Sequence, residues 1–109
     1  VRLKEVILNI LQNALDAVRT DTGIIEIETD VNIYEVSISI KDNGEGIERK
    51  NLKNVASPFF TTKATGTGLG LALCKQVVAS HHGSLTIHSV KGKGTTVAVT
   101  LPIHRPEDA

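Results

Sequence analysis

The sequence predicts an α+β fold, a two-layer sandwich in which a mixed, largely antiparallel sheet carries its helices on one face. Two observations point to it. Two segments have the apolar spacing of amphipathic helices, and four shorter segments have the β-branched or alternating pattern of strands. The strands come in pairs that follow each helix, an order typical of a sheet covered on one side.

The first predicted helix covers residues 1–18. Its apolar residues recur every three or four positions, which places them on one face, and turn chemistry at residues 20–23 ends it. We expect this face to pack against the sheet. The face consists of Leu3, Val6, Ile7, Ile10, Leu11, Ala14 and Val18.

Four strands follow from runs of β-branched residues and from apolar alternation. A polar connection around Asn32 joins the first pair, and the turn at Lys91–Gly94 joins the second, which Pro102 closes. The expected strands are Ile24–Thr29, Val36–Lys41, Leu85–Val90 and Thr96–Leu101.

A long connection rich in Gly, Asn, Thr and Lys, residues 42–66, separates the two strand pairs. Connections of this length in a compact domain are usually functional or mobile, although Glu48–Val55 has the composition for a short helix. The second helix is expected over Leu69–Ser80, with Gly83 as its C-terminal cap signal. Residues 104–109 are expected to form a frayed tail.

Composition narrows the class of protein. The chain has 109 residues, and its 12 Lys and Arg balance 12 Asp and Glu, whereas nucleic-acid-binding domains carry an excess of basic residues. Its single cysteine, Cys74, allows no internal disulfide, and no Cys/His cluster has zinc spacing. No apolar run is long enough to span a membrane. We therefore expect one domain, residues 1–109, without a nucleic-acid partner or direct membrane contact.

The first helix also carries a polar stripe, in which Asn9 and Asn13 lie one turn apart. A solvated helix surface is the plain interpretation, but such surfaces favour Lys and Glu, whereas Asn is a poor helix former. Amide oxygens that face a metal or a nucleotide would explain that cost, because magnesium takes oxygen ligands. The stripe consists of Arg2, Glu5, Asn9, Gln12, Asn13 and Asp16.

A second candidate site begins at Asp42, in the segment Asp42-Asn43-Gly44-Glu45-Gly46-Ile47. The period of two places Asp42 on the inward face that Ile38 and Ile40 share, and a carboxylate there is costly unless it is hydrogen-bonded. Asp42 could bond the following turn or accept from a ligand donor such as the adenine amino group. Without Cβ atoms, Gly44 and Gly46 would let the ligand approach the backbone closely.

A third candidate is Gly66-Thr67-Gly68-Leu69-Gly70-Leu71 at the mouth of the second helix. Free N–H groups at a helix start attract phosphate, yet the glycine spacing fits neither the Rossmann fingerprint nor a Walker-type phosphate loop. By itself the segment is as compatible with a plain turn as with a phosphate-binding loop.

In combination these motifs are specific. The Asn-bearing helix is followed by Asp-x-Gly-x-Gly, by Pro58-Phe59-Phe60-Thr61-Thr62-Lys63, by Gly-x-Gly-x-Gly and by Gly94-Thr95-Thr96 before the last strand. In this order the chain resembles the ATP-binding catalytic domain of sensor histidine kinases, in the superfamily of DNA gyrase, the ninety-kilodalton heat-shock chaperone and the mismatch-repair ATPases. The resemblance covers nearly the whole chain and implies a Bergerat-type ATP-binding fold. Phe59–Lys63 looks most like the nitrogen-regulatory and sporulation kinases.

The resemblance implies ATP and Mg²⁺ as cofactors and assigns roles to residues. Asn13 would coordinate magnesium, Asn9 would assist it, and Lys63 would add positive charge, these three being the catalytic residues. Asp42 would accept from the adenine amino group, with Thr95 supporting the same corner. Residues 47–66 would form the lid over the nucleotide. The implied nucleotide-binding residues are Asn9, Asn13, Asp16, Ala17, Asp42, Gly44, Gly46, Ile47, Phe60, Thr61, Thr62, Lys63, Gly66, Thr67, Gly68, Leu69, Gly70, Leu71 and Thr95.

Two departures from the family pattern bear on the reaction. Many members carry Lys where this chain has Asp16, and the hydrolases carry a Glu general base where it has Asn9. An amide cannot usefully take a proton near neutral pH, and Glu5 lies about 6 Å further along the helix axis. This pattern favours phosphoryl transfer over efficient hydrolysis.

The expected function is therefore donation of the γ-phosphoryl group of Mg-ATP to a histidine on a separate dimerisation domain, followed by transfer to a response regulator. None of the four histidines, His81, His82, His88 and His104, lies in the family's acceptor motif. The alternatives are an ATP hydrolase, a degenerate nucleotide-binding module and an anti-sigma-type serine kinase. We expect the chain to be a piece of a longer kinase and to lie in the cytoplasm, whether or not its parent protein is membrane-anchored.

Overall fold

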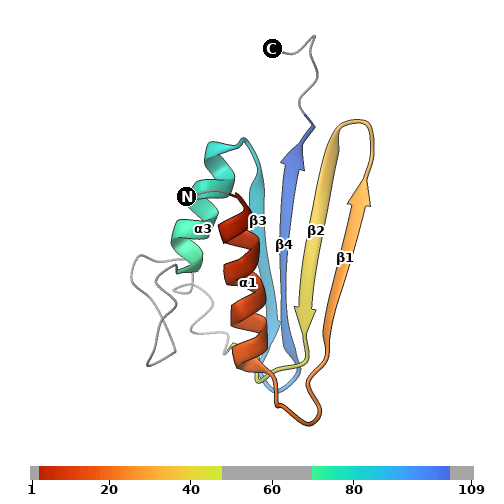
Figure 1. Ribbon diagram of the computed structural model, residues 1–109, viewed down its shortest axis with the longest axis vertical. Coiled ribbons are helices and arrows are strands. Elements are labelled where there is room, and N and C mark those ends of the chain that lie inside the picture. Colours follow the sequence, from red (N-terminus) through yellow and green to blue (C-terminus); the bar gives the residue numbers. More distant parts are fainter. Residues whose placement is uncertain (1–2, 48–69, 104–109) are drawn as a thin grey trace.

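The structure, a computed structural model, describes residues 3–47 and 70–103 (Figure 1). The expected helix at Glu48–Val55, the expected lid after Ile47 and most of the glycine-rich segment lie outside the described residues, as do Arg2, Phe60, Thr61, Thr62, Lys63, Gly66, Thr67, Gly68, Leu69 and the tail at 104–109. The elements are α1 (Leu3–Ala17), β1 (Ile25–Val31), β2 (Glu35–Asp42), α3 (Leu71–Ser80), β3 (Ser84–Val90) and β4 (Gly94–Pro102).

The four described strands form one sheet in the order β1-β2-β4-β3. All three neighbouring pairs are antiparallel. Figure 1 shows α1 and α3 on the same face of this sheet, and the closest strand contacts of α1 are with β2 and those of α3 with β3. The two-layer arrangement expected from the sequence is confirmed.

The core lies between the two helices and the sheet. The apolar face of α1 is buried at Val6, Ile10 and Ala14, as its spacing predicts. The other buried members of the core are Ile40 on β2, Cys74 and Val78 on α3, Leu85 on β3, and Val97 and Val99 on β4. Because these residues come from five elements, the packing fixes how each helix lies on the sheet.

Asn32 determines where β1 and β2 end and begin. Its side-chain Oδ1 accepts hydrogen bonds from the N–H groups of Tyr34 (2.7 Å) and Glu35 (2.9 Å), and its own N–H donates to the Glu35 carbonyl at 3.0 Å. This tight turn lets β1 continue to Val31, two residues beyond the expected end, because the pairing extends up to the turn.

The C-terminal end of α3 has a residue in the left-handed conformation that glycine adopts most readily. His82 takes this conformation, with φ of +65°. The N–H of His82 donates to the Ala79 carbonyl and that of Gly83 to the Val78 carbonyl, which is the Schellman pattern with Gly83 directly after the left-handed residue. Gly83 is needed there for a different reason, because a Cβ would overlap the Thr100 carbonyl oxygen.

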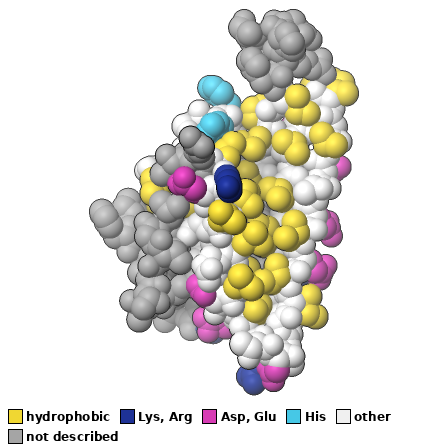
Figure 2. All heavy atoms as spheres, viewed as in Figure 1, with side chains coloured by type: hydrophobic (Ala, Val, Ile, Leu, Met, Phe, Trp, Pro, Cys, Tyr) yellow, Lys and Arg dark blue, Asp and Glu magenta, His cyan; other side chains and the backbone are white. Residues whose placement is uncertain are grey.

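The two described helices do not cover the β1 edge of the sheet. Ile27 on β1 is 52% exposed and Val31 is 67% exposed, and Figure 2 shows apolar side chains gathered over this part of the molecule. No helix among the described residues has both the length and the apolar character needed to cross a membrane.

Replacing Ile10 by Ala tests the core. Ile10 is 2% exposed, so the substitution should lower the free energy of unfolding by about 2–5 kcal/mol because it leaves a cavity. Leu8→Ala is the matched control on the same helix, since Leu8 is 54% exposed and should change stability by about 0.5 kcal/mol or less. Denaturant unfolding measures both, and equal losses would contradict this packing.

A polar contact also joins α1 to α3. Asn9 is buried, and its Nδ2 donates to the Cys74 Sγ at 3.4 Å. Burial raises the pKa of the Cys74 thiol, and the hydrogen bond from Asn9 opposes this shift less strongly. The thiol is therefore held in its neutral form.

The raised pKa of Cys74 predicts a pH-dependent stability. Above the ordinary thiol pKa the unfolded chain ionises first, so the contribution of Cys74 is complete below that pH and is lost as pH rises through the folded value. The free energy of unfolding should therefore fall more steeply with alkaline pH in the unaltered protein than in Cys74→Ala, as measured by denaturant titrations at each pH. Parallel curves would refute this.

Candidate functional site

Asp42 lies at the last position of β2 and faces the helix layer. It follows the inward row of Ile38 and Ile40 and is only 6% exposed. Its Oδ1 accepts a hydrogen bond from the Gly44 N–H at 2.8 Å, so the turn-bonding role considered from the sequence is present. Within residues 3–47 and 70–103 the second oxygen, Oδ2, accepts no hydrogen bond.

The strand register places Asp42 in a row of paired residues that runs across all four described strands. Ile25 pairs with Asp42, Asp42 with Thr95, and Thr95 with Ser89. Directly paired residues of antiparallel strands share one face, so all four side chains lie on the helix side. The structure therefore brings Asp42 and Thr95, both expected at the site, next to each other.

The two glycines after Asp42 pack closely against other parts of the protein. A Cβ on Gly44 would lie 2.6 Å from the Ala17 carbonyl oxygen, and one on Gly46 would overlap the Val90 carbonyl. Gly46 also has φ of +73°, which disfavours any residue with a Cβ. Close packing within the protein requires both glycines, and their expected place beside a ligand stays a prediction.

Asn43 anchors this loop to the start of β1, and sequence reasoning assigned it no role. Its Oδ1 accepts from the Ile24 N–H at 2.8 Å, and its Nδ2 donates to the Thr22 carbonyl at 3.0 Å. These partners lie about twenty residues earlier in the chain, so only the folded strand pair reveals the contact.

The polar stripe of α1 is divided by the fold instead of forming one surface. Asn9 is buried against Cys74, Asn13 is half-buried, and Asp16 is exposed. Gln12 Nε2 donates to the Asp16 Oδ1 at 2.9 Å. The helix end at Ala17 lies against Gly44. The C-terminal end of the stripe is therefore close to the loop at residues 43–47, called the Asp42 loop below.

The start of α3 supplies backbone donors. Gly70 is the N-cap residue, without a side-chain cap, and its carbonyl accepts from the N–H groups of Leu73 and Cys74, each at 3.1 Å. The first N–H groups of a helix have no carbonyl partner within it and favour anions. Leu71 is half-buried and packs against the core.

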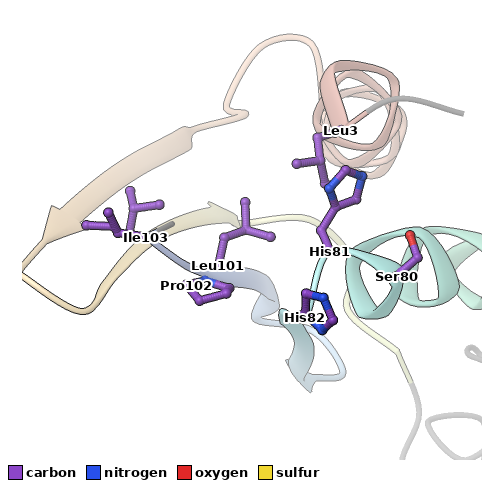
Figure 3. Close-up of a pocket in the computed structure, with 8 residues that line it drawn as sticks. Leu3, Ser80, His81, His82, Leu101, Pro102 and Ile103 are labelled. Atoms are coloured by element: carbon purple, nitrogen blue, oxygen red, sulfur yellow. The ribbon is translucent and has the colours of Figure 1, made fainter. Parts of the chain in front are cut away.

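A pocket of about 740 Å³ lies at the other end of the sheet (Figure 3). His81 and His82 line it beside Val36 and Leu101. The Val36–Leu101 pair stands six positions from the Asp42–Thr95 pair, or about 20 Å along the strands. His88 is next to Ser89 on β3, so its side chain points to the opposite face. Thus His81 and His82 lie at the end of the sheet away from Asp42, and His88 lies near the Asp42 end but on the opposite face.

Comparison with known proteins agrees with this arrangement. Residues 1–105 match the family of histidine kinase-, DNA gyrase B- and HSP90-like ATPases. Sporulation kinase C of Bacillus subtilis is 39% identical, with 94% of this chain and 24% of that protein covered. The signal transduction histidine-protein kinase AtoS of Escherichia coli is 46% identical, with 94% and 17% covered. The chain thus spans about a quarter or less of these relatives.

Solved structures share the fold. The catalytic domain of histidine kinase ThkA, in a nucleotide-free form, superposes with a TM-score of 0.78 at 32% identity over 92% of this chain and 65% of that one. The mycobacterial sensor histidine kinase MprB gives 0.76 at 29% identity over 89% and 69%. The expected likeness to sporulation kinases is confirmed, and the chain belongs to the family of histidine kinase-, DNA gyrase B- and HSP90-like ATPases.

Proposed function

We propose that this chain binds Mg-ATP and donates its γ-phosphoryl group to a histidine on a separate dimerisation domain, from which a response regulator receives it in two-component signalling. The observation that carries the proposal is the buried carboxylate of Asp42, one oxygen of which is fixed by the Gly44 N–H. Family membership and the named histidine kinases among the relatives support it.

The proposed base pocket begins at Asp42. With Oδ1 held by Gly44, Oδ2 can accept from the 6-amino group of adenine, a charge-assisted hydrogen bond in a buried setting. Guanine carries a carbonyl oxygen at that position, which would face the carboxylate and repel it. The pocket should therefore prefer adenine.

The proposed magnesium ligand is Asn13. Within the described residues no group of three or more His, Cys, Asp or Glu could hold a metal, but magnesium between phosphates needs only one or two protein oxygens. The half-buried amide of Asn13 on α1 fits that need. When bound, the ion would neutralise charge on the phosphates. The chain's own task is to orient the nucleotide between α1, the Asp42 loop and the start of α3.

The position of Asn9 favours transfer over hydrolysis. A hydrolase needs a base to take a proton from water, but Asn9 is an amide whose Nδ2 donates to Cys74 in the core. Glu5 is exposed and one turn further from Asn13. The proposed acceptor is therefore a group that another domain brings to the nucleotide.

Asp42→Asn tests the base pocket. The amide can turn its NH₂ group toward the adenine amino group, and losing a charged hydrogen bond should weaken Mg-ATP binding about ten- to hundredfold. Isothermal titration calorimetry of the folded variant measures this. Asp30→Asn is the matched control, because Asp30 is exposed on β1 and should bind as the unaltered protein does. An unchanged affinity in Asp42→Asn would refute the proposal.

Asn13→Ala tests the magnesium role and the reaction together. With radiolabelled ATP and a cognate histidine domain, we expect the unaltered protein to form labelled phosphohistidine. The Asn13→Ala variant should form at least about tenfold less of it. Free phosphate measured in the same reactions should remain a minor product. Phosphate release that outpaces transfer would instead identify a hydrolase.

A further inference from the structure

Ser89 makes three polar contacts at the end of β3, close to the proposed base pocket. Its Oγ lies 2.8 Å from the Ile47 backbone nitrogen, 3.0 Å from the Gly94 carbonyl oxygen and 2.7 Å from the Thr95 Oγ1. The side chain is half-buried. Ser89 thus joins the chain just after the Asp-x-Gly-x-Gly motif to the start of β4.

The chemistry of the partners decides which atom donates in each contact. A carbonyl oxygen can only accept, so the single hydroxyl proton of Ser89 goes to Gly94. The Ile47 N–H can only donate, so Ser89 accepts from it. In the remaining contact Thr95 must therefore donate its own proton to Ser89. Because that proton is committed, the Thr95 hydroxyl can act only as an acceptor toward a ligand.

The surrounding backbone leaves this loop little freedom. The Gly92 N–H donates to the Glu45 carbonyl at 2.7 Å, and Gly46 lies against the Val90 carbonyl. Gly94, with φ of +139°, lies against the Asp42 carbonyl. The turn between β3 and β4 thus packs against the loop that follows Asp42. The Ser89 side chain makes hydrogen bonds to both segments, at Gly94 and at Ile47.

We infer that Ser89 is a positioning residue for the purine amino group. It fixes Ile47 and the Thr95 hydroxyl so that Thr95 and Asp42, paired across β4 and β2, present acceptors to a 6-amino group. The inference rests on the proposed function, since it refines how the same pocket selects its base. Neither the charge nor the spacing of the sequence indicates this role.

Ser89→Ala in the intact protein tests the inference. Removing the hydroxyl frees the Thr95 proton and leaves the Ile47 N–H without its acceptor, so Mg-ATP affinity should fall about tenfold. Purine riboside triphosphate lacks the 6-amino group, and its affinity should change about twofold or less. The ratio of the affinity for ATP to the affinity for purine riboside triphosphate should therefore fall. Ser89→Thr keeps a hydroxyl and should restore it, and Ser84→Ala is the matched control, exposed on the same strand.

The outcomes separate this inference from the proposed function. Equal losses for both nucleotides, or no loss, would overturn the role of Ser89, whereas unchanged ATP affinity in Asp42→Asn would overturn the base pocket itself. Should Ser89→Ala fail to fold, hydrogen exchange in the unaltered protein decides. The Ile47 amide should be protected by its bond to Ser89, and exchange at the rate of a free amide would overturn the inference.

Discussion

The register of β4 between β2 and β3 is the constraint on which the rest of this structure depends. It places Asp42, Thr95 and Ser89 at one level of the sheet and on one face. A shift of β2 by one residue would turn Asp42 toward the opposite face, because side chains alternate along a strand. The same shift would remove Ile40 from the core. Burial of the apolar residues therefore specifies which face of the sheet the Asp42 carboxylate lies on. The packing of the core in this way positions Asp42, Thr95 and Ser89.

The cost of burying a carboxylate is offset locally. Asp42 receives a hydrogen bond from the Gly44 N–H, and that turn is possible because Gly44 packs against the carbonyl of Ala17 without a Cβ. The same contact brings the end of α1 to the loop. One glycine thus links the helix that carries Asn13, the proposed metal ligand, to the strand that carries Asp42, the proposed base acceptor.

Periodicity carried the sequence predictions that the structure confirms, because it is a local property. The period of two predicted that Asp42 faces inward, and the helical spacing predicted the buried residues Val6 and Ile10. The contacts that escaped prediction join distant residues. Asn9 bonds Cys74 at a separation of 65 residues, and Ile47 bonds Ser89 at a separation of 42. The left-handed conformation of His82 was not predicted for another reason. Glycine usually occupies the left-handed position, but here the glycine is at position 83, where tertiary packing leaves no room for a Cβ.

The same distinction explains why Asn9 and Asn13 should not be treated as a pair with one task. They are one turn apart in sequence, yet Asn9 is buried with its amide donating to α3, while Asn13 is half-buried toward the Asp42 end. A carboxylate in place of Asn9 would bury charge against the Cys74 thiol, a neutral group at physiological pH because burial raises its pKa. The α1–α3 interface is thus built for an amide, and it disfavours the buried carboxylate base that hydrolysis would require. The proposed preference for transfer over hydrolysis therefore rests on the same side chain that joins α1 to α3.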